Sequence, residues 1–409
     1  MHEDTLAIVL LAMGDAFYRL HERDSARTAL ESILTQSLLP FWRRVADAST
    51  GEGYQLNHDI AGRWLGPANL ALVTQARMLW FFAHLRRHGR ATAVDGRRAE
   101  RGLAVLIDRF RDKAHGGYFW QLRYSDYAPS KPDKQLYAQS FALFALSEHA
   151  LVSGSAIAAA AAAEAFDVID ARFRDAASGN YAEFLLRDWS VPSPLWKDYL
   201  GGIGGARTQN TRIHLLEALT THYELARSPT VANRLAEVVA LTERALVRAP
   251  AYFFRPTDGG VPARQSYGHD LETIHLLMRG RALLGLCGSP PAFYGKVVDD
   301  ALRLAEDRGL GGVFESGPAG GVPDARGRKD WIQAEALLTL LGAAAESLGL
   351  DRKLKVNTVK KRTHSLFRQG SYWYRAIPAM REERLRDLMT AFAHTVSQHA
   401  VFRGIFGAI

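Results

Sequence analysis

Apolar residues recur at three- and four-residue spacing along most of the chain, which predicts a protein built from helices. Residues 138–147 and 213–219 show the pattern clearly. Strict alternation of apolar and polar residues, which is typical of a half-buried strand, is scarce. The alanine run at residues 156–163 consists of the strongest helix former, so we interpret it as an outer helix and not as a linker. The pattern therefore predicts an all-α fold.

Glycine followed by an aromatic residue separates these helices at several points. The first three such segments lie about 63 residues apart and the later ones at intervals of roughly 50 to 80. A repeat of that length holds two helices and two connections, and the chain holds about six of them. We expect an (α/α)6 barrel with short β-hairpin loops over a central cleft. An open helical solenoid is the alternative, although no polar terminal repeat is visible. The segments are residues 51–54, 116–120, 179–181, 311–314 and 370–374.

The composition indicates an ordinary globular protein, with 47% hydrophobic and 23% charged residues. No Pro/Gly/Ser-rich stretch divides the chain, so we predict a single domain over residues 1–409. The lone Cys287 excludes an internal disulfide and a cysteine-based zinc cluster, which favours a reducing compartment. Apolar residues 6–13 are too few to span a bilayer and follow no basic segment. We therefore expect a cytoplasmic protein without membrane attachment.

The net charge of +8 comes from 51 Lys and Arg against 43 Asp and Glu. Much of it is arginine scattered along helices, and the dense basic cluster at residues 353–362 has no aromatic residues that would stack on bases. We therefore expect no nucleic-acid partner. A positive field is nevertheless compatible with an anionic sugar as substrate.

The segment with the clearest chemistry is residues 266–272, which reads SYGHDLE. His269 and Glu272 are three residues apart and share one face of a helix. A neutral imidazole exchanges a proton near neutral pH, and a carboxylate one turn away can orient it or hold a substrate hydroxyl. Taken alone, the segment also fits a capped helix start with a hydrogen-bonded core histidine.

Polar residues on otherwise apolar segments provide further candidates. Arg77 lies in the apolar run QARMLWFF, where a buried guanidinium requires a carboxylate or an anionic ligand. Tyr137 offers a hydroxyl, and Asn210 and His214 lie one helical turn apart. An arginine with hydroxyls, amides, histidines and an indole is a typical inventory of a carbohydrate site. The remaining candidates are Asp188, Trp331 and Gln333.

Eight motifs in order resemble the N-acylglucosamine 2-epimerase family, which contains cellobiose 2-epimerases and mannose isomerases. The resemblance runs from about residue 40 to residue 345 and implies an (α/α)6 barrel that transfers a proton at C2 of a reducing sugar. It identifies His269 as one acid/base histidine, with Glu272 as its neighbour, and Arg77 as the group at the carbonyl oxygen of the opened sugar. The motifs are QARMLWFF, HGGYFW, LYAQSFALFALSE, LRDW, NTRIHLLEA, SYGHDLE, GGVFESG and WIQAEAL.

The second acid/base histidine implied by the family lies near the C-terminus, where both His399 and His394 fit the motif only in part. The resemblance also places five residues in the substrate pocket. They are Tyr137, Asp188, Asn210, His214 and Trp331.

The chemistry of an aldose explains this set of residues. Removal of the C2 proton leaves an enediolate, which a cationic arginine near O1 stabilises. Two histidines on opposite faces of the substrate invert C2, whereas return of the proton at C1 gives a ketose. Epimerase and isomerase therefore both remain open. The chain contains no HExxH, phosphate loop or convincing dinucleotide motif, so we expect no cofactor.

The sequence departs from the family at residues 62–67, which lack a lysine that many members carry, and at Asp330, where many have a tryptophan. These changes leave the substrate open within the reducing sugars. A glycoside hydrolase with Glu272 and Asp188 as its carboxylates is a second hypothesis. A sugar-binding protein that has lost catalysis is a third. The oligomeric state, monomer or homodimer, is also open.

Overall fold

The structure is a computed structural model. It describes residues 33–48, 52–55, 57–58, 64–202, 207–246, 264–286, 291–307, 313–327 and most of 331–339. The chain forms two compact units. The hairpin unit comprises Phe41–Gln265, Leu276–Ser289 and Phe406–Ile409, and the α10 unit comprises Met1–Pro40, Ser266–His275 and Pro290–Ile405. Helix α9 has residues in both units, so the two units are not two consecutive segments of the sequence. The single domain over residues 1–409 stays a prediction.

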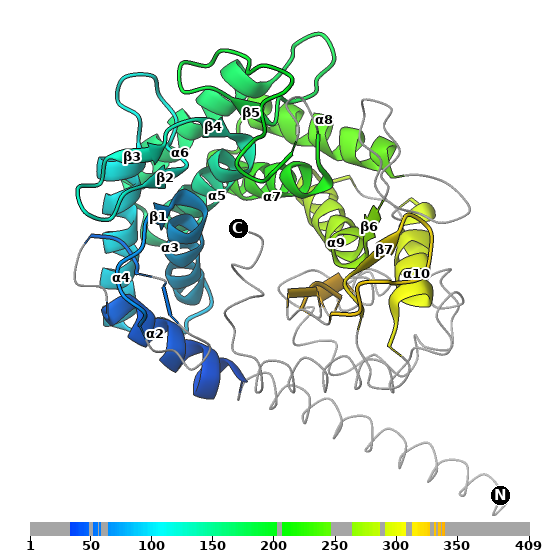
Figure 1. Cartoon of the computed structure of the whole chain (residues 1–409), viewed down its shortest axis with the longest axis horizontal. Helices are drawn as coiled ribbons and strands as arrows, with labels where there is room; N and C mark the ends of the chain where they lie inside the picture. The colour runs from blue at the N-terminus through cyan, green and yellow to red at the C-terminus, as the bar shows by residue number, and fades with distance from the viewer. Residues whose placement is uncertain are drawn as a thin grey trace, which may run out of the picture. The chain divides into compact units, whose positions relative to one another are not determined.

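The hairpin unit is built from pairs of helices joined by short connections. In each pair, the first helix belongs to an inner row and the second packs on its outer side (Figure 1). Helix α5 packs on both α3 and α7, which makes the inner row continuous. The pairs are α3 (Leu72–Arg87) with α4 (Ala93–Val105), α5 (Leu136–Ser153) with α6 (Ala156–Val168), and α7 (Gln209–Ala226) with α8 (Pro229–Ala245).

The sequence predicts these helices for different physical reasons. In α5, every residue from Leu136 to Ala150 is buried, as expected of a helix enclosed by others. In α6, the Ser155 side chain accepts a hydrogen bond from the Ala158 N–H and caps the helix start. The alanine run is therefore helical, and α6 packs on α5 as the outer helix that we predicted.

The remaining helices complete the described part of the chain. Helix α2 (Leu39–Asp47) is joined to α4 by the Arg43 guanidinium, 2.7 Å from the Asp95 carboxylate. The second half of α9 (Tyr267–Leu283) packs on the inner row, because a Cβ at Gly280 would lie 3.4 Å from Leu216. The α10 unit contains α10 (Phe293–Ala305). Short π-helical turns occur at η1 (Ile33–Leu38) in that unit, and at η2 (Leu106–Phe110) and η3 (Ile169–Phe173) in the hairpin unit.

The strands are short, and three of them, β1, β4 and β6, lie directly before helices α3, α5 and α9. β1 (Leu70–Ala71), β2 (Gln121–Leu122) and β3 (Pro129–Lys131) form an antiparallel sheet in that order. β4 (Lys134–Gln135) pairs with β5 (Phe184–Leu185), with Lys134 opposite Leu185. β6 (Arg264–Ser266) precedes α9, and β7 (Ser316–Pro318) follows α10. Short antiparallel strands at the loops are thus confirmed, whereas their place over a central cleft stays a prediction.

The glycine-aromatic repeat in the sequence is a structural repeat. Asp112 and Asp175, 63 residues apart, each accept a hydrogen bond through their backbone carbonyl from a glycine four residues later, at 2.7 and 2.8 Å. Each side chain also accepts from the N–H two residues ahead, at 3.1 and 3.0 Å. The two turns close on isolated antiparallel bridges at Arg111–Tyr118 and Arg174–Tyr181, and a bridge with the same spacing joins Glu306 and Val313.

In two of the inner helices, a glutamine in the first turn bonds to one of the glycine-aromatic loops. The Tyr54 N–H donates to Gln75 Oε1 at 2.7 Å, and Gln75 Nε2 donates to the Tyr54 carbonyl at 2.8 Å. Gln139 bonds to Tyr118 in the same way, at 3.0 and 2.8 Å. We call each such pair of hydrogen bonds a glutamine bridge. It attaches the loop to the start of the inner helix.

The glutamine bridge explains why a glycine precedes the aromatic residue. Gly117 has a φ of +64°, and a Cβ there would lie 3.0 Å from Gln139 Oε1. Gly154, at the C-cap of α5, has a φ of +72°, and a Cβ there would meet no atom within 4 Å.

We expect Gly154→Ala to lower the free energy of unfolding by about 1–2 kcal/mol through backbone strain alone. Gly117→Ala should cost about 1–3 kcal/mol more, because a Cβ there would lie 3.0 Å from both Gln139 Oε1 and the Trp189 ring, so the bridge and the indole must shift. Urea denaturation measures both, and equal losses would contradict this role of the bridge.

Candidate active site

Apart from Asp188, the described candidate residues of the hairpin unit lie in the first two turns of the inner helices. Arg77, Phe141 and His214 are each the sixth residue of their helix, α3, α5 and α7. Adjacent helices therefore present them side by side. The Arg77 guanidinium carbon lies 4.3 Å from the Phe141 ring centroid, which lies 4.6 Å from the imidazole of His214. A cation over an aromatic face is held favourably in this way.

Tyr137 completes this group, which we call the Arg77 cluster (Arg77, Tyr137, Phe141, His214). Arg77 Nη2 donates to the Tyr137 hydroxyl over 3.4 Å. The Tyr137 ring meets His214 edge to face, with centroids 5.3 Å apart. Asn210 is half-buried and lies one turn before His214 on the same face of α7. The structure thus brings together three of the predicted site residues, Arg77, Tyr137 and His214.

His214 is held by a carboxylate that the sequence reading did not select. Its Nδ1 lies 3.0 Å from Oε2 of Glu217, one turn further along α7. Burial lowers the pKa of His214, despite the opposing effect of Glu217, so the imidazole is neutral at neutral pH. Burial raises the pKa of Glu217, but the hydrogen bond from His214 and the charges of Arg279 and Arg77 lower it on balance. The pair is therefore a neutral imidazole and an ionised carboxylate.

The α10 unit contains a second group, the His269 cluster (Ser266, His269, Trp331). The Ser266 hydroxyl lies 2.8 Å from His269 Nδ1, at the start of α9. The Trp331 indole lies beside the imidazole, with ring centroids 4.7 Å apart. A Cβ at Gly268 would lie 2.8 Å from Trp331, so only glycine lets the indole approach this closely. Glu272, one turn after His269, is buried.

The other predicted residues lie elsewhere. Asp188 is exposed in the loop after β5 and accepts hydrogen bonds from the Ser190 N–H at 3.0 Å and hydroxyl at 2.6 Å. The contacts that the structure gives it do not join it to the Arg77 cluster. Gln333 and both C-terminal histidines, His394 and His399, lie outside the described residues, so their roles stay predictions.

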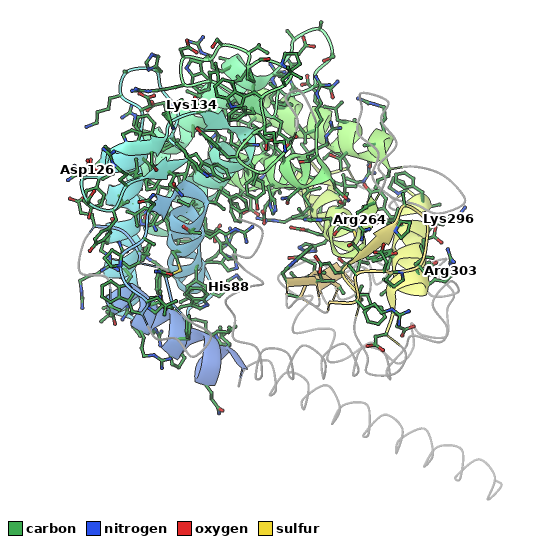
Figure 2. The ribbon with its side chains drawn as sticks, viewed as in Figure 1. His88, Asp126, Lys134, Arg264, Lys296 and Arg303 are labelled. Carbon is green, nitrogen blue, oxygen red and sulfur yellow. The ribbon has the colours of Figure 1, made fainter. Side chains whose placement is uncertain are left out.

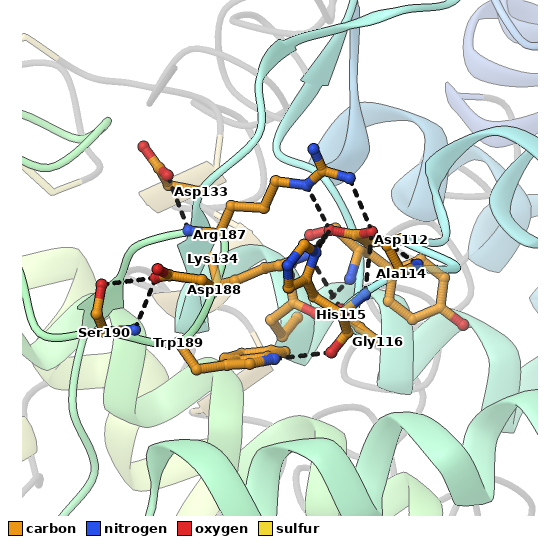
Figure 3. A network of polar contacts seen from close by, with 12 residues as sticks. Asp112, Ala114, His115, Gly116, Asp133, Lys134, Arg187, Asp188, Trp189 and Ser190 are labelled. Atoms are coloured by element: carbon orange, nitrogen blue, oxygen red, sulfur yellow. Dashed lines mark hydrogen bonds and ion pairs between the residues drawn. The ribbon is translucent and has the colours of Figure 1, made fainter.

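A buried ion pair fixes the loops next to Tyr137. Lys134 Nζ lies 2.9 Å from Asp112 Oδ2 (Figure 3), and both side chains are almost completely buried. Figure 2 labels Lys134 within the whole chain. Arg187 Nε lies 2.9 Å from the same carboxylate oxygen. Although burial raises the pKa of Asp112, hydrogen bonds from Arg187 and Lys134 hold it well below its usual value. Sequence reading missed this pair, because its partners are 22 residues apart in separate loops.

The inner row is also polar further along its length. Glu148 of α5 is buried and lies 2.8 Å from both His84 Nδ1 and Arg87 Nη1 of α3. Arg87 Nη2 in turn lies 2.7 Å from Glu224 of α7. These bonds connect all three inner helices near the ends opposite the Arg77 cluster.

Neither a metal site nor a membrane-spanning helix occurs among the described residues. No three His, Cys, Asp or Glu side chains in those parts of the chain are placed to hold a metal ion together. No helix of the described residues has the length and apolar character that crossing a membrane requires.

Comparison with solved structures shows the class of fold. The chain matches the cellobiose 2-epimerase of Bacillus thermoamylovorans B4167 with a TM-score of 0.70 and 22% identity, over 89% of this chain and 87% of that one. The predicted fold class, an all-α (α/α)6 barrel, is thereby confirmed.

Sequence comparison then shows the family. The N-acylglucosamine 2-epimerase family model matches residues 53–395, so the chain belongs to this family, as its motifs predicted. It is 29% identical to a cellobiose 2-epimerase of Bacteroides fragilis over 63% of this chain, and spans just under two thirds, 66%, of that enzyme. It is 27% identical to a D-mannose isomerase of Pseudomonas cannabina pv. alisalensis, over 68% of this chain and 69% of that enzyme.

The Lys134–Asp112 pair generates a stability prediction. Lys134→Met leaves a buried carboxylate with only part of its compensation, so we expect a loss of about 3–5 kcal/mol in the free energy of unfolding. Lys113→Met is the matched control, because Lys113 is exposed, and should change the free energy by less than about 0.5 kcal/mol. Chemical denaturation at pH 7 measures both. A cost as small as that of the control would show that the pair is not a buried ion pair.

The same pair predicts a pH dependence with a defined sign. The pKa of Asp112 is lower in the folded protein than its usual 3.8, so its contribution to stability is complete above that pH. The contribution is lost as the pH falls below 3.8 toward the folded-state pKa. The stability difference between wild type and Lys134→Met should therefore shrink in acid. A difference that grows as the pH falls would contradict the assignment.

Proposed function

We propose that this protein is an enzyme that transfers a proton at C2 of a reducing sugar through an enediolate, as a sugar 2-epimerase or an aldose-ketose isomerase. The family match carries the proposal, supported by relatives that are named cellobiose 2-epimerase and D-mannose isomerase. The substrate is a small reducing sugar, and the reaction needs no cofactor.

In this proposal, His269 is the acid/base group. Its Nδ1 faces the Ser266 hydroxyl at 2.8 Å, and we assign the proton to Nδ1 and a basic lone pair to Nε2, an arrangement that this contact allows. Because Ser266 can accept from Nδ1–H in both protonation states, His269 can gain and lose a proton at Nε2 without losing this bond. The Trp331 indole beside it restricts the orientation of the ring.

Arg77 is assigned to the developing negative charge on the sugar oxygen. Its guanidinium is already held over Phe141 and against Tyr137, so little reorganisation is needed when charge appears on the substrate. The second proton donor is His399 or His394. Return of the proton to C2 from the opposite face gives the epimer, and return to C1 gives the ketose.

The two rival hypotheses predict different products. A hydrolase would use Glu272 and Asp188, but the hydrogen bond from Ser190 lowers the pKa of Asp188, which does not suit a general acid. A binding protein would retain the sugar without converting it. Incubation with a panel of reducing sugars that includes cellobiose distinguishes all three, since an epimerase or isomerase converts one of the sugars, a hydrolase releases glucose from cellobiose, and a binding protein converts none of them.

The role of His269 is tested by substitution in the full chain. His269→Asn should lower kcat by about 10²-fold or more, because acid/base catalysis is lost, with little change in thermal stability. His115→Asn is the matched control, since His115 is exposed in a loop, and should retain wild-type activity. The assay uses mannose, glucose, fructose, N-acetylglucosamine, N-acetylmannosamine and cellobiose with product chromatography. Near-normal turnover by His269→Asn would overturn the assignment.

Ser266 provides a finer test of the same histidine. Ser266→Ala removes the partner of Nδ1, so we expect kcat to fall about tenfold and the acid limb of the pH–rate profile to move. Ser178→Ala removes an exposed hydroxyl that bonds to Asp175 and serves as the control. An unchanged pH profile in Ser266→Ala would show that Ser266 does not orient His269.

A further inference from the structure

The turn after β5 contains a residue in a strained backbone conformation. Trp189 has a φ of +72° and is one of three non-glycine residues in the described parts of the chain with a positive φ. The Leu186 carbonyl accepts from the Trp189 N–H at 2.9 Å, and the Leu186 N–H donates to the Ser190 carbonyl at 3.0 Å. A three-residue turn of this kind favours glycine at its left-handed position, because a Cβ there crowds the backbone. An indole at that position must be held by contacts that outweigh the strain.

The Trp189 indole makes such contacts with other parts of the hairpin unit. Its Nε1 donates at 2.7 Å to the backbone carbonyl of His115, which any residue there supplies (Figure 3). Its ring meets Phe173 edge to face, with centroids 5.7 Å apart, and lies 5.4 Å from Lys134 Nζ. A Cβ at Gly117 would lie 3.0 Å from it. The indole is therefore fixed against a glycine-aromatic loop, η3 and β4.

Arg187 anchors the turn on the other side of Asp188. Its Nε and Nη2 donate to the two carboxylate oxygens of Asp112, at 2.9 and 3.1 Å, which makes a bidentate pair. Its backbone N–H donates to Asp133 Oδ1 at 2.9 Å. Both neighbours of Asp188 are thus bound to other elements. We call residues 186–190 the Asp188 turn.

Asp188 itself points away from these anchors. Figure 3 shows its side chain directed toward Ser190, whose N–H and hydroxyl both donate to Oδ1. Oδ2 takes part in neither bond, and the residue is exposed. A carboxylate that is ionised only accepts hydrogen bonds, so Oδ2 suits a ligand group that carries an O–H or N–H.

The Asp188 turn lies at the end of the inner row that carries the Arg77 cluster. Lys134 of β4 pairs with Leu185 of β5, and the turn follows directly. β4 in turn runs straight into α5, in which Tyr137 is the second residue. One strand pair therefore connects the turn with the helix start that places Tyr137.

We propose that Trp189 and Arg187 are positioning residues, which hold the Asp188 turn so that Asp188 presents Oδ2 to a hydroxyl of the bound sugar. The inference rests on the proposed function for its ligand, a reducing sugar, and on the pocket role that the family resemblance implies for Asp188. It deepens that function by naming the residues that fix this carboxylate without touching the ligand. A carboxylate that is already ordered loses little freedom when the sugar binds, so loss of an anchor weakens binding through Asp188 alone.

A double-mutant cycle tests whether Trp189 acts through Asp188. Trp189→Phe keeps a ring but removes the donor to the loop carbonyl, and Asp188→Asn removes the carboxylate. Full-length protein is titrated by calorimetry with the six sugars of the activity assay. We expect affinity to fall about three- to tenfold in Trp189→Phe and about tenfold or more in Asp188→Asn. The double variant should bind no more weakly than Asp188→Asn. Additive losses, or wild-type affinity in Trp189→Phe, would overturn the inference.

Arg187 gives a second, independent cycle. Arg187→Lys keeps a positive charge near Asp112 but loses the planar fork, so affinity should fall about threefold, and no further in the Asp188→Asn background. Arg174→Lys is the matched control, because Arg174 forms the corresponding bidentate pair with Glu237 of α8, at 3.0 and 3.2 Å. It should leave sugar affinity unchanged. Equal losses in Arg174→Lys and Arg187→Lys would overturn the inference, because they would show a general effect of weakening such a pair.

Turnover separates this inference from the proposed function. With the sugar that is converted, KM should rise more than kcat falls in Trp189→Phe. Coupled losses of binding without conversion of any sugar would contradict the proposed function alone. Conversion by the wild type without coupling between Trp189 and Asp188 would overturn this inference alone.

Discussion

The glutamine bridge is the interaction on which the site of the hairpin unit depends. Gln75 and Gln139 hold the preceding aromatic loops at the fourth residue of α3 and α5. Arg77 follows Gln75 by two residues, and Tyr137 precedes Gln139 by two. A change in either bridge would therefore move the helix start that places these side chains.

The start of α7 is held in place by different hydrogen bonds, without a glutamine bridge in the described residues. Its fourth residue is Arg212, and its first turn is held instead by the buried Glu183, which accepts hydrogen bonds from Thr208 and Thr211 at 2.6 and 2.7 Å. The buried pair of Lys134 with Asp112, and the bond from the exposed Arg87 to the buried Glu148, act in a similar way between elements. Buried ion pairs add little net stability compared with apolar packing, but they penalise any arrangement that separates the partners. They fix geometry around the inner row.

Local sequence patterns predicted the parts of the fold that depend on local physics. The alanine run of α6, the buried helix α5 and the glycine-aromatic turns all follow from nearby residues. Arg77, Tyr137 and His214 were found through family motifs, and the structure brings them together. Glu217 was missed because α7, like α5, is an inner helix with most of its residues buried, so its pattern does not show which polar residue faces which neighbour. The contact of Lys134 with Asp112 depends on how two loops fold back, which spacing alone does not reveal.

The most direct test of proton transfer at C2 is proton NMR of the wild-type protein in heavy water with a panel of reducing sugars. The account predicts that deuterium appears at C2 of the sugar that is turned over, at a rate no slower than product formation. The product then separates epimerase from isomerase. Conversion of a sugar without any incorporation of solvent deuterium, or binding without exchange, would contradict the enediolate mechanism.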